Sequence, residues 1–128
     1  MVLNSALVVD DDPSIREAIV LLLEDMGVPH VSEAGDGVQA IEALNGPTPD
    51  VMVLDLMMPR MDGIEVLRAI RMGKTTGRPH RIIVLSAYID HSAASQLKSL
   101  GADAWINKPF SLDELQRAIL APAMSVGL

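Results

Sequence analysis

The stretch VMVLDLMMPRMDGIEVL, residues 51–67, decides the fold. Residues 51–54 form a continuous apolar run, which is typical of a strand that is covered on both faces of a parallel sheet. Apolar residues then recur with helical spacing over residues 64–70, and Asp62 stands where it can cap that helix. The stretch therefore predicts a buried strand followed by a helix, which is the repeating unit of α/β proteins.

The same alternation extends over the rest of the chain. Further apolar runs occupy residues 6–9, 28–31, 82–85 and 104–106. Segments with helical spacing occupy residues 15–26, 38–44, 93–100 and 112–119. Together they predict an α/β fold, a doubly wound five-stranded parallel sheet with five helices. We expect one domain over residues 5–121 and a short, frayed C-terminal tail over residues 122–128.

Residues that start and stop helices stand at the ends of these segments. Asp12 precedes Pro13, which is an N-cap followed by a first-turn proline. Gly27 follows the first helical segment, and residues 45–47 (Asn-Gly-Pro) follow the second. Residues 111–114 (Ser-Leu-Asp-Glu) are a capping box. The caps therefore support the element order that the apolar pattern predicts.

The composition excludes several classes of function. The 128 residues contain no cysteine, which excludes disulfides and thiolate metal sites. The 10 basic and 17 acidic residues give a net charge of −7, which argues against direct binding to nucleic acid or to an anionic membrane. We see no secretory signal, and the apolar runs are too short to span a bilayer. We therefore expect a cytoplasmic domain.

Polar side chains follow the predicted strands at the points where the strands end. They are Asp10 and Asp11 after the first strand, Asp55 after the third, Ser86 after the fourth and Lys108 after the fifth. The carboxyl ends of parallel strands lie along one edge of the sheet, where ligands bind. We therefore expect these carboxylates, the hydroxyl group and the ammonium group to meet in one crevice.

This set of side chains favours metal-assisted chemistry at phosphorus. Two carboxylates about 4 Å apart repel each other by about 4 kcal/mol at an effective dielectric constant of about 20. Either one of them binds a proton or a cation lies between them. An all-oxygen ligand set suits Mg²⁺, and Ser86 and Lys108 are then placed to bind an anion beside the metal. The pattern predicts phosphoryl transfer to an aspartate.

At this point the chain resembles a known family, the receiver domain of two-component response regulators, which has a flavodoxin-like topology. The matching stretches are LVVDDDPSIR, AGDGVQAIEAL, PDVMVLDLMMPRMDGIEVL, VLSAY and GADAWINKPFSLDEL. They stand in family order over residues 5–121. Each stretch is a weak signal alone, but all of them in order at family spacing are highly specific.

The resemblance implies a role for each residue of the predicted crevice. Asp55 would be the phosphoacceptor, and Ser86 and Lys108 would each bind a phosphoryl oxygen. Asp11 would bind Mg²⁺ directly and Asp10 largely through water. The full set of metal ligands would be Asp10, Asp11, Asp55 and the backbone carbonyl of Met57.

The resemblance also implies partners and a switch. The phosphodonor would be a histidine kinase or a phosphotransfer protein. Trp105 stands where the family carries its switch aromatic, commonly Tyr or Phe, and its rotation would reshape a surface that binds a downstream target or a second copy of the chain. The Lys108–Pro109 peptide bond would be cis. Tyr88 would shield the phosphoryl group from water.

Other interpretations stay open at this stage. A receiver-like interaction module that needs no phosphate would keep the same fold. An aspartyl-nucleophile phosphatase is less favoured, because it usually has a second acid two positions after the nucleophile, where this chain has Met57. Residues 35–40 (GDGVQA) fit a dinucleotide-binding pattern, but they do not follow the first strand and they leave Asp10, Asp11 and Lys108 unexplained. The chain is either a stand-alone receiver or a part of a larger regulator or hybrid kinase.

Overall fold

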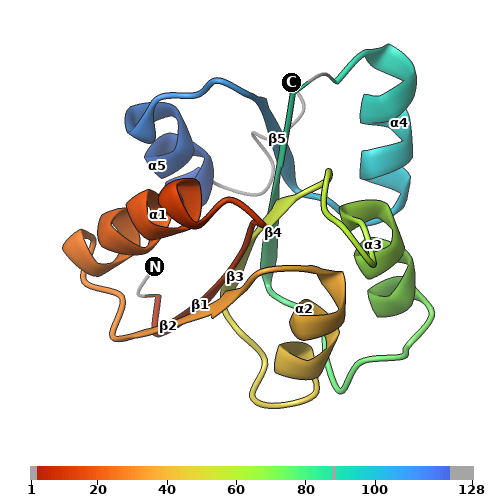
Figure 1. Cartoon of the computed structure of the whole chain (residues 1–128), viewed down its shortest axis with the longest axis horizontal. Helices are drawn as coiled ribbons and strands as arrows, with labels where there is room; N and C mark the ends of the chain where they lie inside the picture. Colours follow the sequence, from red (N-terminus) through yellow and green to blue (C-terminus); the bar gives the residue numbers. More distant parts are fainter. Residues whose placement is uncertain (1–2, 88, 122–128) are drawn as a thin grey trace.

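The computed structural model describes residues 3–87 and 89–121, and in these residues five parallel strands form one sheet that alternates with five helices (Figure 1). The strands are β1 Ser5–Val9, β2 His30–Ala34, β3 Val51–Asp55, β4 Arg81–Ser86 and β5 Ala104–Asn107. The helices are α1 Pro13–Asp25, α2 Gly37–Leu44, α3 Gly63–Arg71, α4 His91–Ser99 and α5 Leu112–Leu120. The predicted α/β fold is confirmed. The tail expected over residues 122–128 lies outside the described residues.

The strand order is β2-β1-β3-β4-β5. β2 lies on one side of β1 and β3 to β5 lie on the other, so the strand order reverses between β1 and β3. In a doubly wound sheet the crevice at such a reversal, outside the carboxyl ends of the strands, is where ligands bind. The register aligns Val9 of β1 with Leu54 of β3, which brings the residues after both strands to the same level. The topology therefore supplies the crevice that the polar residues require.

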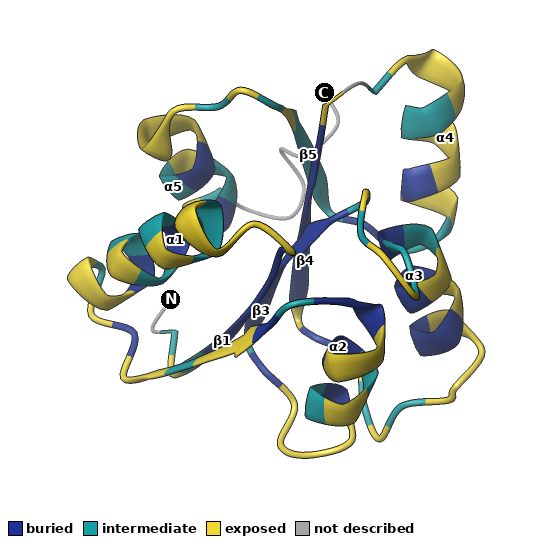
Figure 2. Cartoon of the chain, viewed as in Figure 1, coloured by how far each residue is buried: buried dark blue, intermediate teal, exposed yellow. Residues whose placement is uncertain are grey.

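Helices cover both faces of the sheet and produce two apolar cores (Figure 2). One core lies under α1 and α5, and the other lies under α2, α3 and α4. Every residue of β3 and β4 is buried, as continuous apolar runs predict for central strands of a parallel sheet. None of the described helices is long and apolar enough to cross a membrane.

The position of β2 differs from its prediction. The apolar run predicted a strand over residues 28–31, whereas the strand runs from His30 to Ala34. β2 is an edge strand that pairs only with β1 among the described strands, and most of its side chains are exposed. Val28 is buried but precedes the strand, directly after the turn at Gly27. An edge strand needs no continuous apolar run, which is why the pattern marked the wrong residues.

The start of α2 lies against the loop between β3 and α3. Asp36 is the N-cap of this helix and accepts a hydrogen bond from the Gln39 N–H. The Gly37 N–H donates to the Met61 carbonyl over 3.1 Å, and a Cβ atom on Gly37 would lie 2.2 Å from that oxygen. The pattern GDGVQA therefore contains a glycine that close packing requires, which gives it a structural role in this chain.

Replacing Gly37 with Ala should lower the free energy of unfolding by about 1–3 kcal/mol, because the added methyl group forces the α2 backbone away from Met61. Urea unfolding would measure this loss. Gly35→Ala is the matched control, since the nearest atom to its added Cβ would be Gln39 Oε1, at an ordinary contact distance of 3.5 Å. Equal stability of the two variants would contradict the close approach.

Candidate functional site

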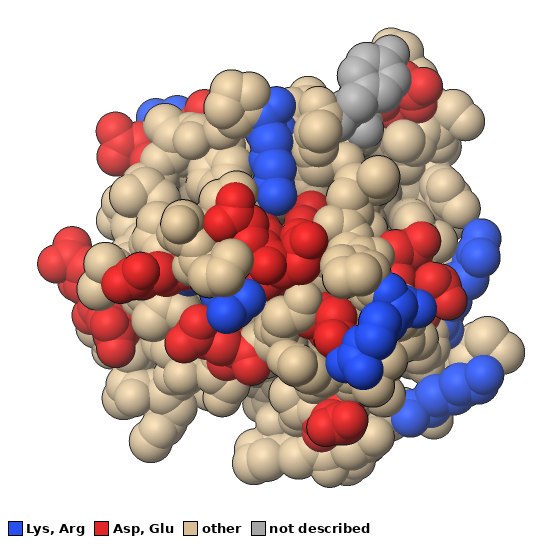
Figure 3. Space-filling view, in the orientation of Figure 1, with Lys and Arg blue, Asp and Glu red and all other residues tan. Residues whose placement is uncertain are grey.

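Three carboxylates gather at the carboxyl edge of the sheet. Asp10 directly follows β1, Asp11 is next to it, and Asp55 is the last residue of β3. One carboxylate oxygen of each lies within 4.8 Å of the others. Asp10 is 0% exposed and Asp55 is 2% exposed, whereas Asp11 faces solvent. Figure 3 shows acidic side chains gathered in the middle of this face.

Lys108 reaches the two buried carboxylates from the loop between β5 and α5. Its Nζ lies 3.2 Å from Asp10 Oδ2 and 3.4 Å from Asp55 Oδ1. The Lys108 N–H donates to the Ser86 carbonyl over 2.6 Å, which ties this loop to the end of β4. The Lys108–Pro109 peptide bond is cis, as expected. The lysine thus contacts a carboxylate 98 positions before it in the chain.

Burial and neighbouring charges shift the pKa values of Asp55 and Lys108. Burial raises the pKa of Asp55 to about 6, and the neighbouring Asp10 carboxylate adds to the rise, while Lys108 and the Met57 N–H oppose it. Burial alone would lower the pKa of Lys108, but the Asp55 and Asp10 carboxylates raise it above its ordinary value. Lys108 therefore stays charged at neutral pH, and Asp55 loses its proton at a higher pH than an ordinary aspartic acid does.

The donor atoms fit a hard divalent cation. Three carboxylates close together carry up to three negative charges, and Lys108 offsets one of them. An all-oxygen set with this residual charge suits Mg²⁺, which is usually bound by one or two carboxylates together with water and phosphate oxygens. The residues present therefore fit the magnesium site that the sequence predicts.

The loop after β3 holds Asp55 in place through its backbone. The Met57 N–H donates to Asp55 Oδ1 over 3.2 Å, and the Leu56 N–H donates to the Leu85 carbonyl over 3.0 Å. The Gly63 N–H returns to the Leu56 carbonyl over 3.0 Å and closes the loop. A Cβ atom on Gly63 would lie 2.6 Å from the Asp55 carbonyl oxygen. Gly63 is a site residue that the sequence analysis missed, although it directly follows the predicted cap Asp62.

Ser86 and Trp105 lie on the neighbouring strands. Ser86 ends β4 and is 4% exposed, one residue beyond Leu85, which pairs with Asp55 in the register. Trp105 pairs with Val84 and is half-buried against the core under α2, α3 and α4. Tyr88 lies outside the described residues, so its predicted shielding role stays a prediction.

Arg16 is a second residue that the sequence analysis missed. Its NH1 group donates to the Asp10 carbonyl over 2.7 Å, and its Nε lies 3.0 Å from Glu33 Oε1. This contact fixes the backbone that presents Asp10. The available signal was composition, since Arg16 is the one Lys or Arg in the first 50 residues of the chain.

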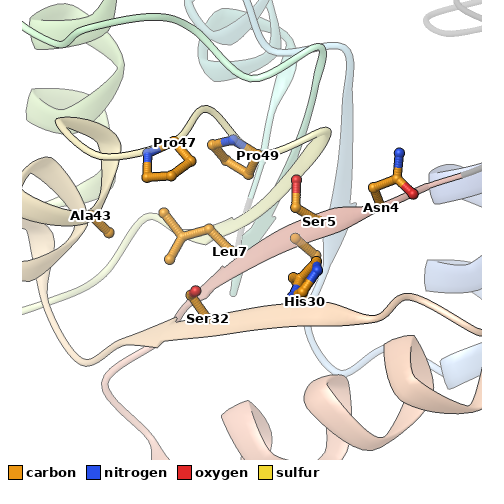
Figure 4. Close-up of a pocket in the computed structure, with 9 residues that line it drawn as sticks. Asn4, Ser5, Leu7, His30, Ser32, Ala43, Pro47 and Pro49 are labelled. Carbon is orange, nitrogen blue, oxygen red and sulfur yellow. The ribbon is translucent and has the colours of Figure 1, made fainter.

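Described residues line a hollow beside Lys108 and another at the opposite end of the sheet. One of about 560 Å³ borders Lys108 and is lined by Ser14, Ile15, Ala18, Lys108, Pro109, Phe110 and Leu112. The other, of about 570 Å³, lies at the amino-terminal end of β1 and β2 and is walled on one side by Pro47 and Pro49 (Figure 4). None of the predicted site residues lines this second hollow.

In metal-free buffer at about pH 8, Asp55→Asn should raise the free energy of unfolding by on the order of 2 kcal/mol. The carboxyl binds its proton more tightly in the folded state, where its pKa is about 6 against an ordinary 3.8. The wild-type protein therefore loses stability as the pH rises through that interval, and the uncharged variant does not. Urea unfolding from about pH 4 to 8 would measure the divergence.

The two proteins should converge at the acidic end of this range. Glu17→Gln on the exposed side of α1 is the control and should track the wild type throughout. A wild-type protein as stable as Asp55→Asn at the alkaline end would show that Lys108 neutralises the buried carboxylates completely.

Comparison with known proteins agrees with this geometry. The family model of the response regulator receiver domain matches residues 6–120. The response regulator MprA of Mycobacterium ulcerans (strain Agy99) is 44% identical over 117 residues, which cover 89% of this chain and 49% of that protein. The chain thus spans about half the length of the curated relatives it matches.

Solved structures show the same likeness. The Francisella response regulator 1452 receiver domain aligns with a TM-score of 0.80 and 34% identity, over 91% of this chain and 93% of that one. The Borrelia burgdorferi structure described as a CheX-CheY-BeF3-Mg²⁺ complex aligns with a TM-score of 0.82 and 26% identity, over 91% of this chain and 87% of that one. The chain belongs to the response regulator receiver domain family of two-component signalling systems.

Proposed function

We propose that this domain is a signalling switch that accepts a phosphoryl group on Asp55. The observation that carries the proposal is the Lys108 ammonium group, which contacts both buried carboxylates at the sheet edge. An ammonium group held there can pair with the carboxylates before the reaction and with the oxygens of an incoming phosphoryl group during it. A purely structural ion pair would not need a third carboxylate, that of Asp11, within 4.8 Å.

The chemistry follows from the contacts of Asp55. Its Oδ1 accepts the Met57 N–H and faces Lys108, so we assign the attack on phosphorus to Oδ2. A bond forms between that oxygen and phosphorus, and the bond from phosphorus to the donor breaks, with its electron pair leaving on the donor. Lys108 then stabilises the charge on the phosphoryl oxygens, and Ser86 at the end of β4 bonds another of them.

Mg²⁺ completes the site in this proposal. Asp10, Asp11, Asp55 and the Met57 carbonyl would hold it, directly or through water. When bound, the ion neutralises phosphoryl oxygens and aligns the donor. The likeness to a structure described with BeF3 and Mg²⁺ supports this assignment.

The phosphodonor in this proposal is a histidine kinase or a phosphotransfer protein, as the family implies. The hollow beside Lys108 offers an apolar surface next to the phosphoacceptor, made by α1 and the loop before α5. Ile15, Pro109 and Phe110 line it, and a helical partner with an apolar face fits such a surface. Docking there would bring a phosphohistidine close to Asp55.

The readout in this proposal is a change of surface. The phosphoryl group adds about two negative charges at the carboxyl edge. Ser86 moves toward it, and Trp105, which is half-buried on the neighbouring strand, changes its packing. The surface around α4, β5 and α5 then binds a downstream target or a second copy. We place the receiver at residues 5–121 and the domain in the cytoplasm, with no direct contact to nucleic acid or membrane.

Acetyl phosphate with Mg²⁺ should add one phosphoryl group to the wild-type protein, and intact-mass analysis would detect it. Asp55→Asn should abolish the adduct, because the attacking oxygen is lost, and chelation of Mg²⁺ should abolish it in the wild type. Asp12→Asn is the matched control: Asp12 caps α1 and should leave the adduct intact. A wild-type protein that binds Mg²⁺ but forms no adduct would favour a phosphate-independent interaction module.

Fluorescence of the single tryptophan, Trp105, should change when beryllofluoride is added to the Mg²⁺-loaded protein. The change follows from repacking of a half-buried indole when the neighbouring strand end moves. Asp55→Asn should show no response to beryllofluoride. A phosphorylated protein with unchanged emission would remove Trp105 as the switch residue and leave the phosphoacceptor assignment standing.

A further inference from the structure

We propose that Asp36 and Arg60 are positioning residues of the acidic site: their ion pair, the Asp36–Arg60 latch, holds the loop of residues 56–62 that presents Met57. The inference rests on the proposed function, in which the Met57 carbonyl is a metal ligand. Neither residue contacts the three carboxylates of the site, and the latch acts through the loop backbone.

The latch joins a fixed carboxylate to a side chain on the loop. Arg60 Nε donates to Asp36 Oδ2 over 2.9 Å, and Arg60 NH2 contacts the same oxygen. The other oxygen, Oδ1, accepts the Gln39 N–H as the cap of α2. The Asp36 side chain is 11% exposed and that of Arg60 is 59% exposed. Asp36 is therefore anchored to α2 by its cap, and Arg60 is the part that is held.

The backbone of Arg60 has an unfavourable conformation that a contact such as this ion pair can stabilise. Its φ is 64°, and it is the one non-glycine residue with a positive φ within residues 3–87 and 89–121. An L-residue other than Gly, Asn or Asp rarely adopts this region, because Cβ crowds the backbone. Isolated strain of this kind persists where surrounding contacts determine the conformation. The ion pair with Asp36 is such a contact.

A second contact fastens the neighbouring residue. The Gly37 N–H donates to the Met61 carbonyl over 3.1 Å, so two successive loop residues are bound to the first turn of α2. The Met61 N–H in turn bonds the Pro59 carbonyl over 2.7 Å. The far side of α2 is packed into the core through Ala40 and Leu44, which makes the helix a firm support.

The loop transmits this support to the site. It is closed at its base by the Gly63 N–H to the Leu56 carbonyl, and Met57 follows that base and donates to Asp55 Oδ1. A displacement of residues 60 and 61 therefore changes the direction of the Met57 peptide group. Residues that do not bind a metal themselves but orient its ligands influence the affinity of the site for the metal.

The test uses variants that separate the ion pair from the backbone strain. Arg60→Ala removes the ion pair and keeps the strain, whereas Arg60→Gly removes both, since glycine accepts a positive φ. Arg60→Lys keeps the charge without the planar fork. Asp36→Asn keeps the cap, because Asn caps helices as well as Asp, and removes the charge. Arg68→Ala, an exposed arginine on α3, is the matched control.

Two quantities are measured: the Kd for Mg²⁺ by calorimetry, and hydrogen exchange of the Gly37 and Gly63 amides by NMR. Loss of the latch in Arg60→Ala, Arg60→Gly and Asp36→Asn should raise the Kd for Mg²⁺ about tenfold and speed exchange of both amides. Arg60→Lys should recover part of the affinity. Arg68→Ala should match the wild type in both measurements.

The outcomes separate the latch from the proposed function. Wild-type affinity and exchange in both Arg60→Ala and Arg60→Gly would overturn the latch. Loss in Arg60→Ala with full retention in Arg60→Gly would also overturn it, because strain alone would then be responsible. A wild-type protein that binds no Mg²⁺ would overturn the metal site, and the exchange of Gly37 and Gly63 would still decide whether the ion pair holds the loop.

Discussion

Repulsion between two buried carboxylates, Asp10 and Asp55, is the constraint on which the rest of the structure depends. Asp10 follows the buried apolar residues of β1, Asp55 ends β3 after four buried apolar residues, and each is almost fully removed from water. At about 4 Å such a pair costs about 4 kcal/mol even at a moderate dielectric constant. The two apolar cores offset this cost, and Lys108 partly neutralises it. The site keeps a net negative charge, which favours the binding of a cation.

The parts of the fold that could be predicted are those that a local pattern specifies. Continuous apolar runs marked β1, β3 and β4 because both faces of these strands are buried. Caps marked α1, α3 and α5 because their side chains bond the helix's own first turn. The edge strand β2 was placed two residues early, since its burial depends on neighbours and leaves no periodic signal.

The site, too, has a part that could be predicted from the sequence and a part that could not. Asp10, Asp11, Asp55 and Lys108 were predicted to meet because strand ends converge whatever the loops do, and the structure brings them together. The contacts of Arg16 with the Asp10 carbonyl and of Arg60 with Asp36 could not be predicted. Arg16 lies on α1 six positions after Asp10, and Arg60 lies 24 positions after Asp36, but each contact depends on a side-chain direction that no spacing encodes.

The order in which the site residues occur along the chain has a consequence for synthesis. The first 50 residues contain 10 of the 17 acidic residues and a single Lys or Arg, whereas the bridging lysine comes at position 108. A nascent chain on the ribosome therefore exposes its carboxylates long before their cation has been made. Lys108 reaches Asp10 and Asp55 from the loop that follows β5, so this ion pairing forms only once β5 has joined the sheet. The last strand to be synthesised thus also brings the acidic site its neutralising charge.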